Sequence, residues 1–161
     1  MRAPLADLPL SYRLFLATYR WRRAEAVPVA TLRSPLTRCR VALVTTAGLV
    51  ARGDRPFDLQ VRGGDWSWRV IVSGAHPQTL ISHHRSDAFD RAPLAADVNV
   101  AFPLDVLKML VATGEIGDVA PRHLSFMGSI TAPARLVRES APAAAELLVA
   151  DRVDAALLVP V

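Results

Sequence analysis

Several residue types are scarce in this sequence, and the first is cysteine, which occurs once, as Cys39. A single cysteine cannot form a disulfide within the chain, which favours the reducing cytoplasm. Long apolar runs are missing too: the longest, such as "VDAALLVPV", reach about nine residues, whereas a membrane-spanning helix needs about 20. The N-terminal stretch "MRAPLADLPLSYRLFLATYRWRR" has neither a long apolar segment nor a small-residue cleavage site typical of a secretory signal. We therefore expect a cytoplasmic protein that does not bind a membrane.

Lysine is equally scarce, because Lys108 is the single lysine among 19 basic residues. The arginines lie along the whole chain, and their one dense cluster is at residues 20–23. A nucleic-acid-binding surface would concentrate basic residues on one element or face. We therefore expect no nucleic-acid partner, despite the net charge of +4.

The residues that are abundant predict a folded α/β protein. Apolar residues make up 52% of the 161 residues, which excludes intrinsic disorder and is enough for one core. We expect an N-terminal helix and connector over residues 1–37 and a single α/β domain over residues 38–161. Apolar spacing predicts strands over residues 41–44, 68–72, 123–128 and 153–161. It predicts helices over residues 9–23, from Pro103 to Gly114 or Gly117, and over 140–152, where Ser140 is the expected N-cap.

The order of these elements indicates the kind of sheet. Helices alternate with strands that are apolar throughout, which is typical of parallel strands covered on both faces. We predict a mostly parallel sheet with helices on both faces, in a Rossmann-like or flavodoxin-like three-layer arrangement. The N-terminal helix is expected to pack across this domain as an arm.

In such sheets, ligands bind outside the carboxyl ends of the strands. The rule selects Thr45 and Thr46 in "VTTAG", Met127 and Gly128 in "SFMGS", and the position after Val161. Hydroxyls and backbone N–H groups at these ends could orient an anionic group of a substrate. Turn formation by the glycines, and burial of Met127 in the core, are the alternatives.

Two polar stretches outside the strands supply further candidates. In "DVNVAFPLD", Asn99 precedes a helix N-terminus, where it could either bind a substrate or cap the helix. In "SHHRSDAF", His83, His84 and Asp87 could bind a metal, line a polar cleft as proton donors or acceptors, or lie in a solvated loop. Asp87 is therefore both a candidate substrate contact and a candidate metal ligand.

Eight stretches, taken in order, resemble the selenoprotein B family of glycine, sarcosine, betaine and D-proline reductases. They cover almost the whole chain from Ser11 onward. The stretches are "SYRLFLATYRWRR", "RVALVTTAGL", "PFD", "GGDWSWR", "ISHHRSD", "DVNVAFPLDVLKMLVATGEIG", "HLSFMGSI" and "VDAALLVPV".

The resemblance implies a catalytic residue that this chain does not contain. In that family, the segment similar to "VDAALLVPV" is followed at once by selenocysteine or cysteine, then by a second cysteine three residues later and a helix. We therefore expect the nucleophile of a reductase directly after Val161. We expect this chain to be a fragment that ends before the nucleophile, because the selenocysteine codon UGA is normally read as a stop. We expect no reductase activity from the chain alone, with His83 and His84 in supporting roles only.

The resemblance also implies a small-molecule substrate and a partner reductase subunit, while a homo-oligomer is the alternative. We expect no bound cofactor and no bound metal. The longer protein is expected to contain selenocysteine. Two other functions remain open from the residues themselves. One is a metal-binding or metal-dependent enzyme that uses His83, His84 and Asp87. The other is a non-catalytic interaction domain that docks a partner through its last strand or its N-terminal arm.

Overall fold

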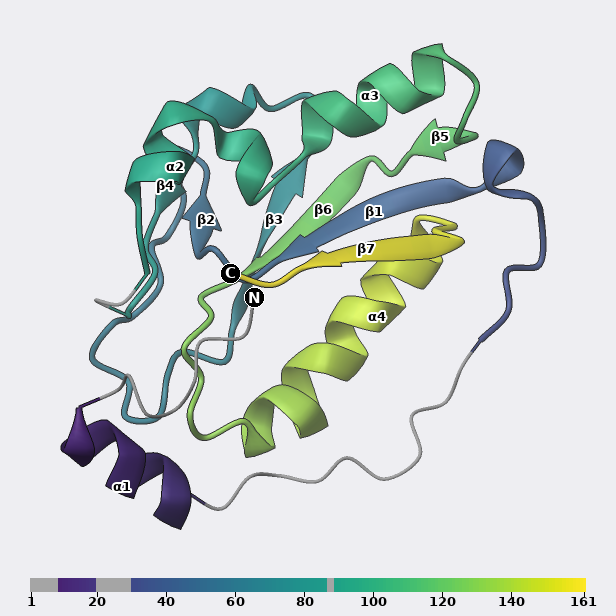
Figure 1. Ribbon diagram of the computed structural model, residues 1–161. Helices are drawn as coiled ribbons and strands as arrows, with labels where there is room; N and C mark the ends of the chain where they lie inside the picture. The colour runs from purple at the N-terminus through teal and green to yellow at the C-terminus, as the bar shows by residue number, and fades with distance from the viewer. Residues whose placement is uncertain (1–8, 20–29, 87–88) are drawn as a thin grey trace. The chain divides into compact units, whose positions relative to one another are not determined.

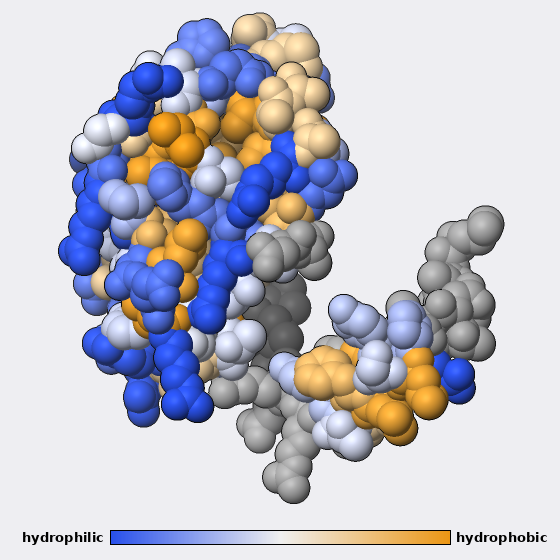
Figure 2. All heavy atoms as spheres, turned by 90° about the vertical axis from the view of Figure 1, so that its left-hand side faces the viewer, coloured by the Kyte–Doolittle hydropathy of each residue, from blue (hydrophilic) through white to orange (hydrophobic). Residues whose placement is uncertain are grey.

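The computed structural model describes residues 9–19, 30–86 and 89–161. The chain divides into two units, residues 1–31 and 32–161. In the first unit, helix α1 (Leu10–Thr18) begins after Pro9, whose carbonyl oxygen accepts hydrogen bonds from the amides of Tyr12 and Arg13. This confirms the first part of the helix predicted over residues 9–23, which ends earlier than predicted because Tyr19 has an extended backbone (φ −67°, ψ 122°). Residues 20–23 lie outside the described residues. None of the residues of α1 is buried, and Figure 2 shows hydrophobic residues, coloured orange, at the surface of this helix.

The second unit is built on a mostly parallel sheet, which confirms the predicted mixed α/β fold (Figure 1). Strand β1 (Arg40–Thr45) pairs in parallel with β7 (Ala155–Val159) on one side. On its other side it pairs in parallel first with β5 (Asp118–Val119) and then with β6 (Arg122–Phe126). Strand β3 (Trp68–Val72) lies beyond β6 and is antiparallel to it.

The last strand differs from its prediction. The apolar run predicts a buried strand, but β7 pairs with β1 alone among the described strands. The side chains of Leu157 and Leu158 are 44% and 67% exposed. An apolar sequence pattern cannot distinguish a central strand from an edge strand, because pairing is decided by residues far away in the chain.

Helices cover both faces of the sheet. On one face, α3 (Leu104–Ala112) buries Leu104 and Leu107, which are three residues apart and so lie on the same side of the helix. The short helices α2 (Ala92–Ala96) and η4 (Val98–Val100) complete this main core. On the opposite face lies α4 (Ala141–Ala150) (Figure 1). None of the described helices is both long and apolar enough to span a bilayer.

The connections contain short elements that the sequence does not reveal. Strands β2 (Leu49–Val50) and β4 (Ile81–Ser82) form a separate antiparallel pair. Two single turns of 3₁₀-helix, η2 (Leu36–Arg38) and η3 (Pro77–Thr79), lie in segments where the sequence predicts neither a helix nor a strand. Elements of two or three residues are too short to produce a detectable apolar period.

The start of the last helix corrects the predicted cap. Ser140 has helical dihedral angles (φ −74°, ψ −42°) and makes no capping hydrogen bond. The wide π-helical segment η5 (Leu136–Ser140) leads directly into α4. Pro142 has no N–H to donate to the preceding turn, and a wider turn is one way for a helix to accommodate it.

The His123 side chain accepts a backbone hydrogen bond from β1 next to the gap between β5 and β6. Pro121 separates β5 from β6, and the backbone N–H of Leu43 on β1 donates to Nδ1 of His123 instead (2.9 Å). Nε2 of the same ring therefore carries the proton and donates to Oγ of Ser73 (3.0 Å), whose hydroxyl donates to the carbonyl oxygen of Ala120. Burial lowers the pKa of His123 to about 4, with a smaller contribution from Lys108. His123 is thus a neutral structural residue.

Candidate active site at the carboxyl ends of the strands

The sheet brings together the three strand ends that the sequence selects. The backbone N–H of Thr46, just after β1, donates to the carbonyl oxygen of Val159 at the end of β7 (3.2 Å). The hydroxyl of Thr46 accepts a hydrogen bond from the N–H of Val161 (2.9 Å) and donates to its carbonyl oxygen (3.3 Å). The amide of Gly48 donates to the carbonyl oxygen of Phe126, the last residue of β6 (2.9 Å). These bonds set the path of the chain at Val161.

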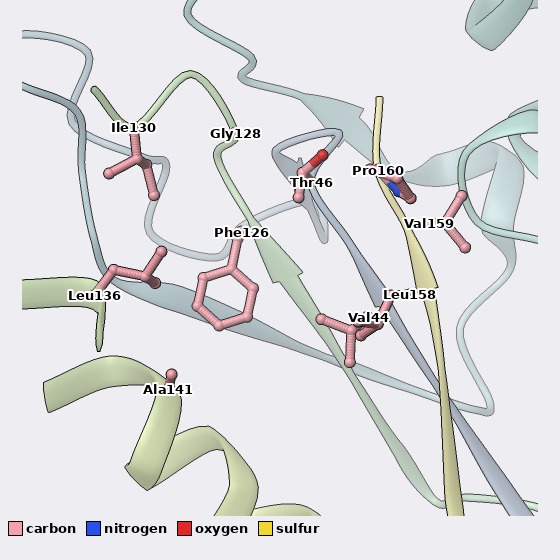
Figure 3. Close-up of a pocket in the computed structure, with 10 residues that line it drawn as sticks. All are labelled: Val44, Thr46, Phe126, Gly128, Ile130, Leu136, Ala141, Leu158, Val159 and Pro160. Atoms are coloured by element: carbon pink, nitrogen blue, oxygen red, sulfur yellow. The ribbon is translucent and has the colours of Figure 1, made fainter. Parts of the chain in front are cut away.

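A cavity of about 490 Å³ opens beside these strand ends, between the sheet and the start of the last helix (Figure 3). Such a volume lies within the range of small-molecule sites. Its lining surface is almost entirely apolar. The wall is formed by Val44, Thr46, Phe126, Gly128, Ile130, Leu136, Ala141, Leu158, Val159 and Pro160. Thr46 and Gly128 are therefore the predicted substrate contacts that reach this cavity.

Gly128 is required at its position by two independent features. Its φ angle of +68° lies in the left-handed region that favours glycine. A Cβ atom added there would come within 2.5 Å of the carbonyl oxygen of Thr46 and 2.6 Å of Nε2 of His84. The absence of a side chain thus lets the His84 ring pack directly behind the cavity wall.

His84 is a buried, neutral ring with one nitrogen unused. It is 4% exposed, and its ring packs against that of Phe89 with 4.4 Å between centroids. Nδ1 accepts a hydrogen bond from the backbone N–H of Ser86 (3.1 Å), so the proton of the neutral ring is on Nε2. Nε2 has no hydrogen-bond partner within the described part of the chain. Burial is the main cause that lowers the pKa of His84, and Arg91 lowers it further.

The neighbouring residue His83 has different surroundings from His84. The backbone N–H of His83 donates to the carbonyl oxygen of Gly48 (2.8 Å), which holds this segment against the turn after β1. Within residues 9–19, 30–86 and 89–161, no three histidine, cysteine, aspartate or glutamate side chains are grouped closely enough to hold a metal ion. Asp87 lies outside the described residues, so the trio of His83, His84 and Asp87 stays a prediction.

Three other candidates lie away from the cavity wall. Thr45 is fully buried, and its Oγ1 accepts a hydrogen bond from the amide of Ala47 (3.2 Å). Met127 is fully buried in a small separate cluster with Val50 and Phe57. The Asn99 side chain donates to Asp97 and Asp105 and accepts from the amide of Asp105, which lies in the first turn of helix α3. Asn99 thus takes the alternative role of organising a helix start, as its neighbouring Asp97 also does.

Sequence reasoning missed the residues that approach the cavity from the helical side. Leu136 lies in η5, before the predicted helix start at Ser140; Ile130 lies in the irregular segment ahead of it, and Ala141 is the second residue of the predicted helix. The signal was present in Pro133, because proline is favoured in the first turn of a helix. Cys39, at the amino end of β1, is buried beside the carbonyl oxygens of Ser34 and Pro35 and takes no part in this site.

The fold and cavity together define a mixed α/β protein with a small-molecule-sized hollow at the carboxyl edge of its sheet. A family model described as glycine/sarcosine/betaine reductase selenoprotein B matches residues 9–161. The chain belongs to this family, which confirms the resemblance seen in the sequence. No solved structure shows a significant match to the chain.

Three curated relatives come from reductases. The D-proline reductase subunit gamma of Acetoanaerobium sticklandii is 35% identical over 118 residues, which are 73% of this chain and 47% of that protein. The betaine reductase complex component B subunit beta of Peptoclostridium acidaminophilum is 28% identical over 72% of this chain and 26% of its own length. The glycine reductase complex component B subunit gamma of Carboxydothermus hydrogenoformans is 28% identical over 83% of this chain and 31% of its own length. The chain thus spans about half the length or less of the curated relatives it matches.

Proposed function

We propose that this chain forms the strand-end wall of the active site in a selenol- or thiol-dependent reductase, whose nucleophilic selenocysteine or cysteine follows Val161. Family membership supports the reductase, and the three relatives are named as subunits of D-proline, betaine and glycine reductases. The observation that carries the proposal is the pair of hydrogen bonds between the Thr46 hydroxyl and the backbone of Val161. They hold Val161 at the rim of a cavity of about 490 Å³.

The position suits a reactive selenolate or thiolate. A residue at the carboxyl end of a parallel strand that leads into a helix lies at the helix N-terminus. The positive end of the helix dipole lowers the pKa of a thiol there and stabilises its anion. A cysteine three residues further on would lie one turn along the same helix and could resolve an oxidised intermediate.

The residues of this chain would then bind and orient the substrate. We assign Thr46 and Gly128 to the cavity wall that contacts it, and His84 to a supporting position behind Gly128. Because the pKa of His84 is lowered by burial, its ring is neutral at pH 7 and keeps the proton on Nε2. His84 would thus hold the wall without adding a positive charge to it.

The setting of the domain is part of the same proposal. The sheet and its helices would form a Rossmann-like three-layer unit in a cytoplasmic enzyme, assembled with a partner reductase subunit. The names of the relatives as complex components and subunits support the partner. A homo-oligomer is the alternative assembly.

A second candidate function, a non-catalytic interaction domain, is favoured by one observation. Strand β7 carries two leucines that are 44% and 67% exposed, beside a backbone edge that pairs with no other described strand. Such an edge can pair with another chain. Light scattering of the purified protein tests self-association through this edge: a monomer would count against it, whereas an oligomer would be compatible with either function.

The coding DNA directly after the Val161 codon tests the main proposal. We expect UGA in the transcript or a cysteine codon, followed by a frame that encodes cysteine three codons later and then a helix. UAA or UAG, or a downstream frame without these features, would contradict it. The longer protein should lose reductase activity after alkylation with iodoacetamide, whereas the 161-residue chain should show none before or after that treatment.

A further inference from the structure

Among the residues that the structure describes, none that forms the wall of the cavity at the strand ends is charged. The one polar side chain among them is that of Thr46, and its hydroxyl is already bonded to the backbone of Val161. The remaining surface comes from aliphatic side chains, the Phe126 ring and the backbone of Gly128 (Figure 3). The polar atoms of the site are thus confined to its rim, where β1 and β7 end.

This wall discriminates between kinds of ligand. A charged ammonium or carboxylate buried in an apolar hollow loses its hydration, and no opposite charge in this wall replaces it. A hydrocarbon group has the opposite preference, since burying apolar surface is favourable in proportion to the area removed from water. Ligand charge is therefore expected at the rim and ligand hydrocarbon inside.

We propose that the cavity binds the apolar body of a small molecule, so that the substrate of this protein carries a hydrocarbon chain or ring and presents its polar, reacting group at the Thr46–Val161 rim. The relatives are named for glycine, betaine and D-proline, which are small and polar for their size. The substrate class inferred here is larger and more apolar. The inference rests on the proposed function for the reacting group, but the apolar binding site itself does not depend on it.

The size and the position of the cavity suit a small molecule. The volume of about 490 Å³ is that of a ligand site, and the cavity opens at the carboxyl edge, where α/β sheets bind their ligands. Leu136 and Ala141 face the sheet residues Val44 and Leu158 across it (Figure 3). Substitutions on the helical side should therefore change the depth of the cavity without touching the strands.

Binding of two matched carboxylates to the 161-residue chain tests the inference. Cyclohexanecarboxylate and acetate have the same charged group and differ only in the hydrocarbon ring. We expect cyclohexanecarboxylate to bind at least about tenfold more tightly, by calorimetry or ligand-observed NMR, because the ring removes several CH₂ groups from water. Ala141→Phe, which fills the cavity from the helix, should abolish this preference.

Val149→Phe is the matched control, because Val149 lies on the same helix, is 73% exposed and is not part of the wall. It should keep the preference for the ring. If Ala141→Phe does not fold, as judged by circular dichroism, Leu136→Phe replaces it as the variant that fills the cavity. Equal affinity for both carboxylates, or equal effects of the wall and control variants, would overturn the inference.

The outcome is independent of the nucleophile. The 161-residue chain ends at Val161, so ligand binding to it tests the apolar site alone. The codon after Val161 tests the reductase proposal alone. Failure of one therefore does not imply failure of the other.

Discussion

Lowering the pH from about 7 to about 4 should destabilise this protein through His123. The ring is fully buried, accepts a hydrogen bond from the Leu43 amide at Nδ1 and uses its Nε2 proton toward Ser73. A second proton must therefore go to Nδ1, where it breaks the bond to Leu43 and places a charge inside the core. The unfolded chain takes up that proton freely, so acid favours unfolding.

The magnitude follows from the pKa of His123, which burial lowers from 6.5 to about 4. Each pKa unit corresponds to about 1.4 kcal/mol, so the ring contributes about 3 kcal/mol of stability when it is neutral in both states. Because the folded-state pKa is the lower one, this contribution is complete above pH 6.5. It declines as the pH falls from 6.5 to about 4, and is lost below that. For a domain with about 5–15 kcal/mol of total stability, the loss is substantial.

Urea unfolding at a series of pH values measures the effect. His123→Asn keeps an acceptor near the position of Nδ1 but cannot titrate, so its stability should be lower at pH 7 and fall less toward pH 4. His76→Asn, at an exposed histidine, should follow the wild-type curve. Other acid-sensitive groups, including His84, are present in all three proteins and cancel in the comparison. Equal losses of unfolding free energy in the wild type and His123→Asn would refute the reasoning.

Three other substitutions or treatments have defined outcomes. Gly128→Ala should lower the melting temperature more than Gly53→Ala. Both glycines have positive φ angles, but only at Gly128 would an added Cβ come within 2.5 Å of the Thr46 carbonyl oxygen. Equal shifts of the two melting temperatures in calorimetry would contradict this. Thr46→Val removes both hydrogen bonds to Val161 and should lower the unfolding free energy by about 1 kcal/mol, with faster amide exchange at Val161 as the specific sign. Cys39 is fully buried, so Ellman's reagent should label it only in denaturant, and rapid labelling of the native protein would show the burial to be wrong.

The sequence predicted which strand ends meet at one edge of the sheet. Thr46 and Gly128 were selected because residues at the carboxyl ends of apolar strands in a parallel sheet meet at one edge, and the structure confirms this meeting. It could not separate them from Thr45 and Met127, their immediate neighbours, which are buried elsewhere. In a strand, adjacent side chains point to opposite faces, and only the packing of the sheet decides which face borders the cavity.

The sequence alone determined the family through its resemblance to known reductases, and it predicted the main helices and strands through short-range apolar spacing. It placed the ends of β6 and β7 two residues too late, at Gly128 and Val161 instead of Phe126 and Val159. Tertiary structure decided what depends on distant partners. It placed Leu136 and Ala141 opposite Val44 across the cavity, and it paired the apolar strand β7 with β1 alone among the described strands. It also gave two buried histidines different hydrogen bonding. Both ring nitrogens of His123 are hydrogen-bonded, whereas Nε2 of His84, next to Gly128, has no hydrogen-bond partner among the described residues. A ring nitrogen is satisfied or not only by atoms that folding brings to it, and neighbours in the sequence do not identify those atoms.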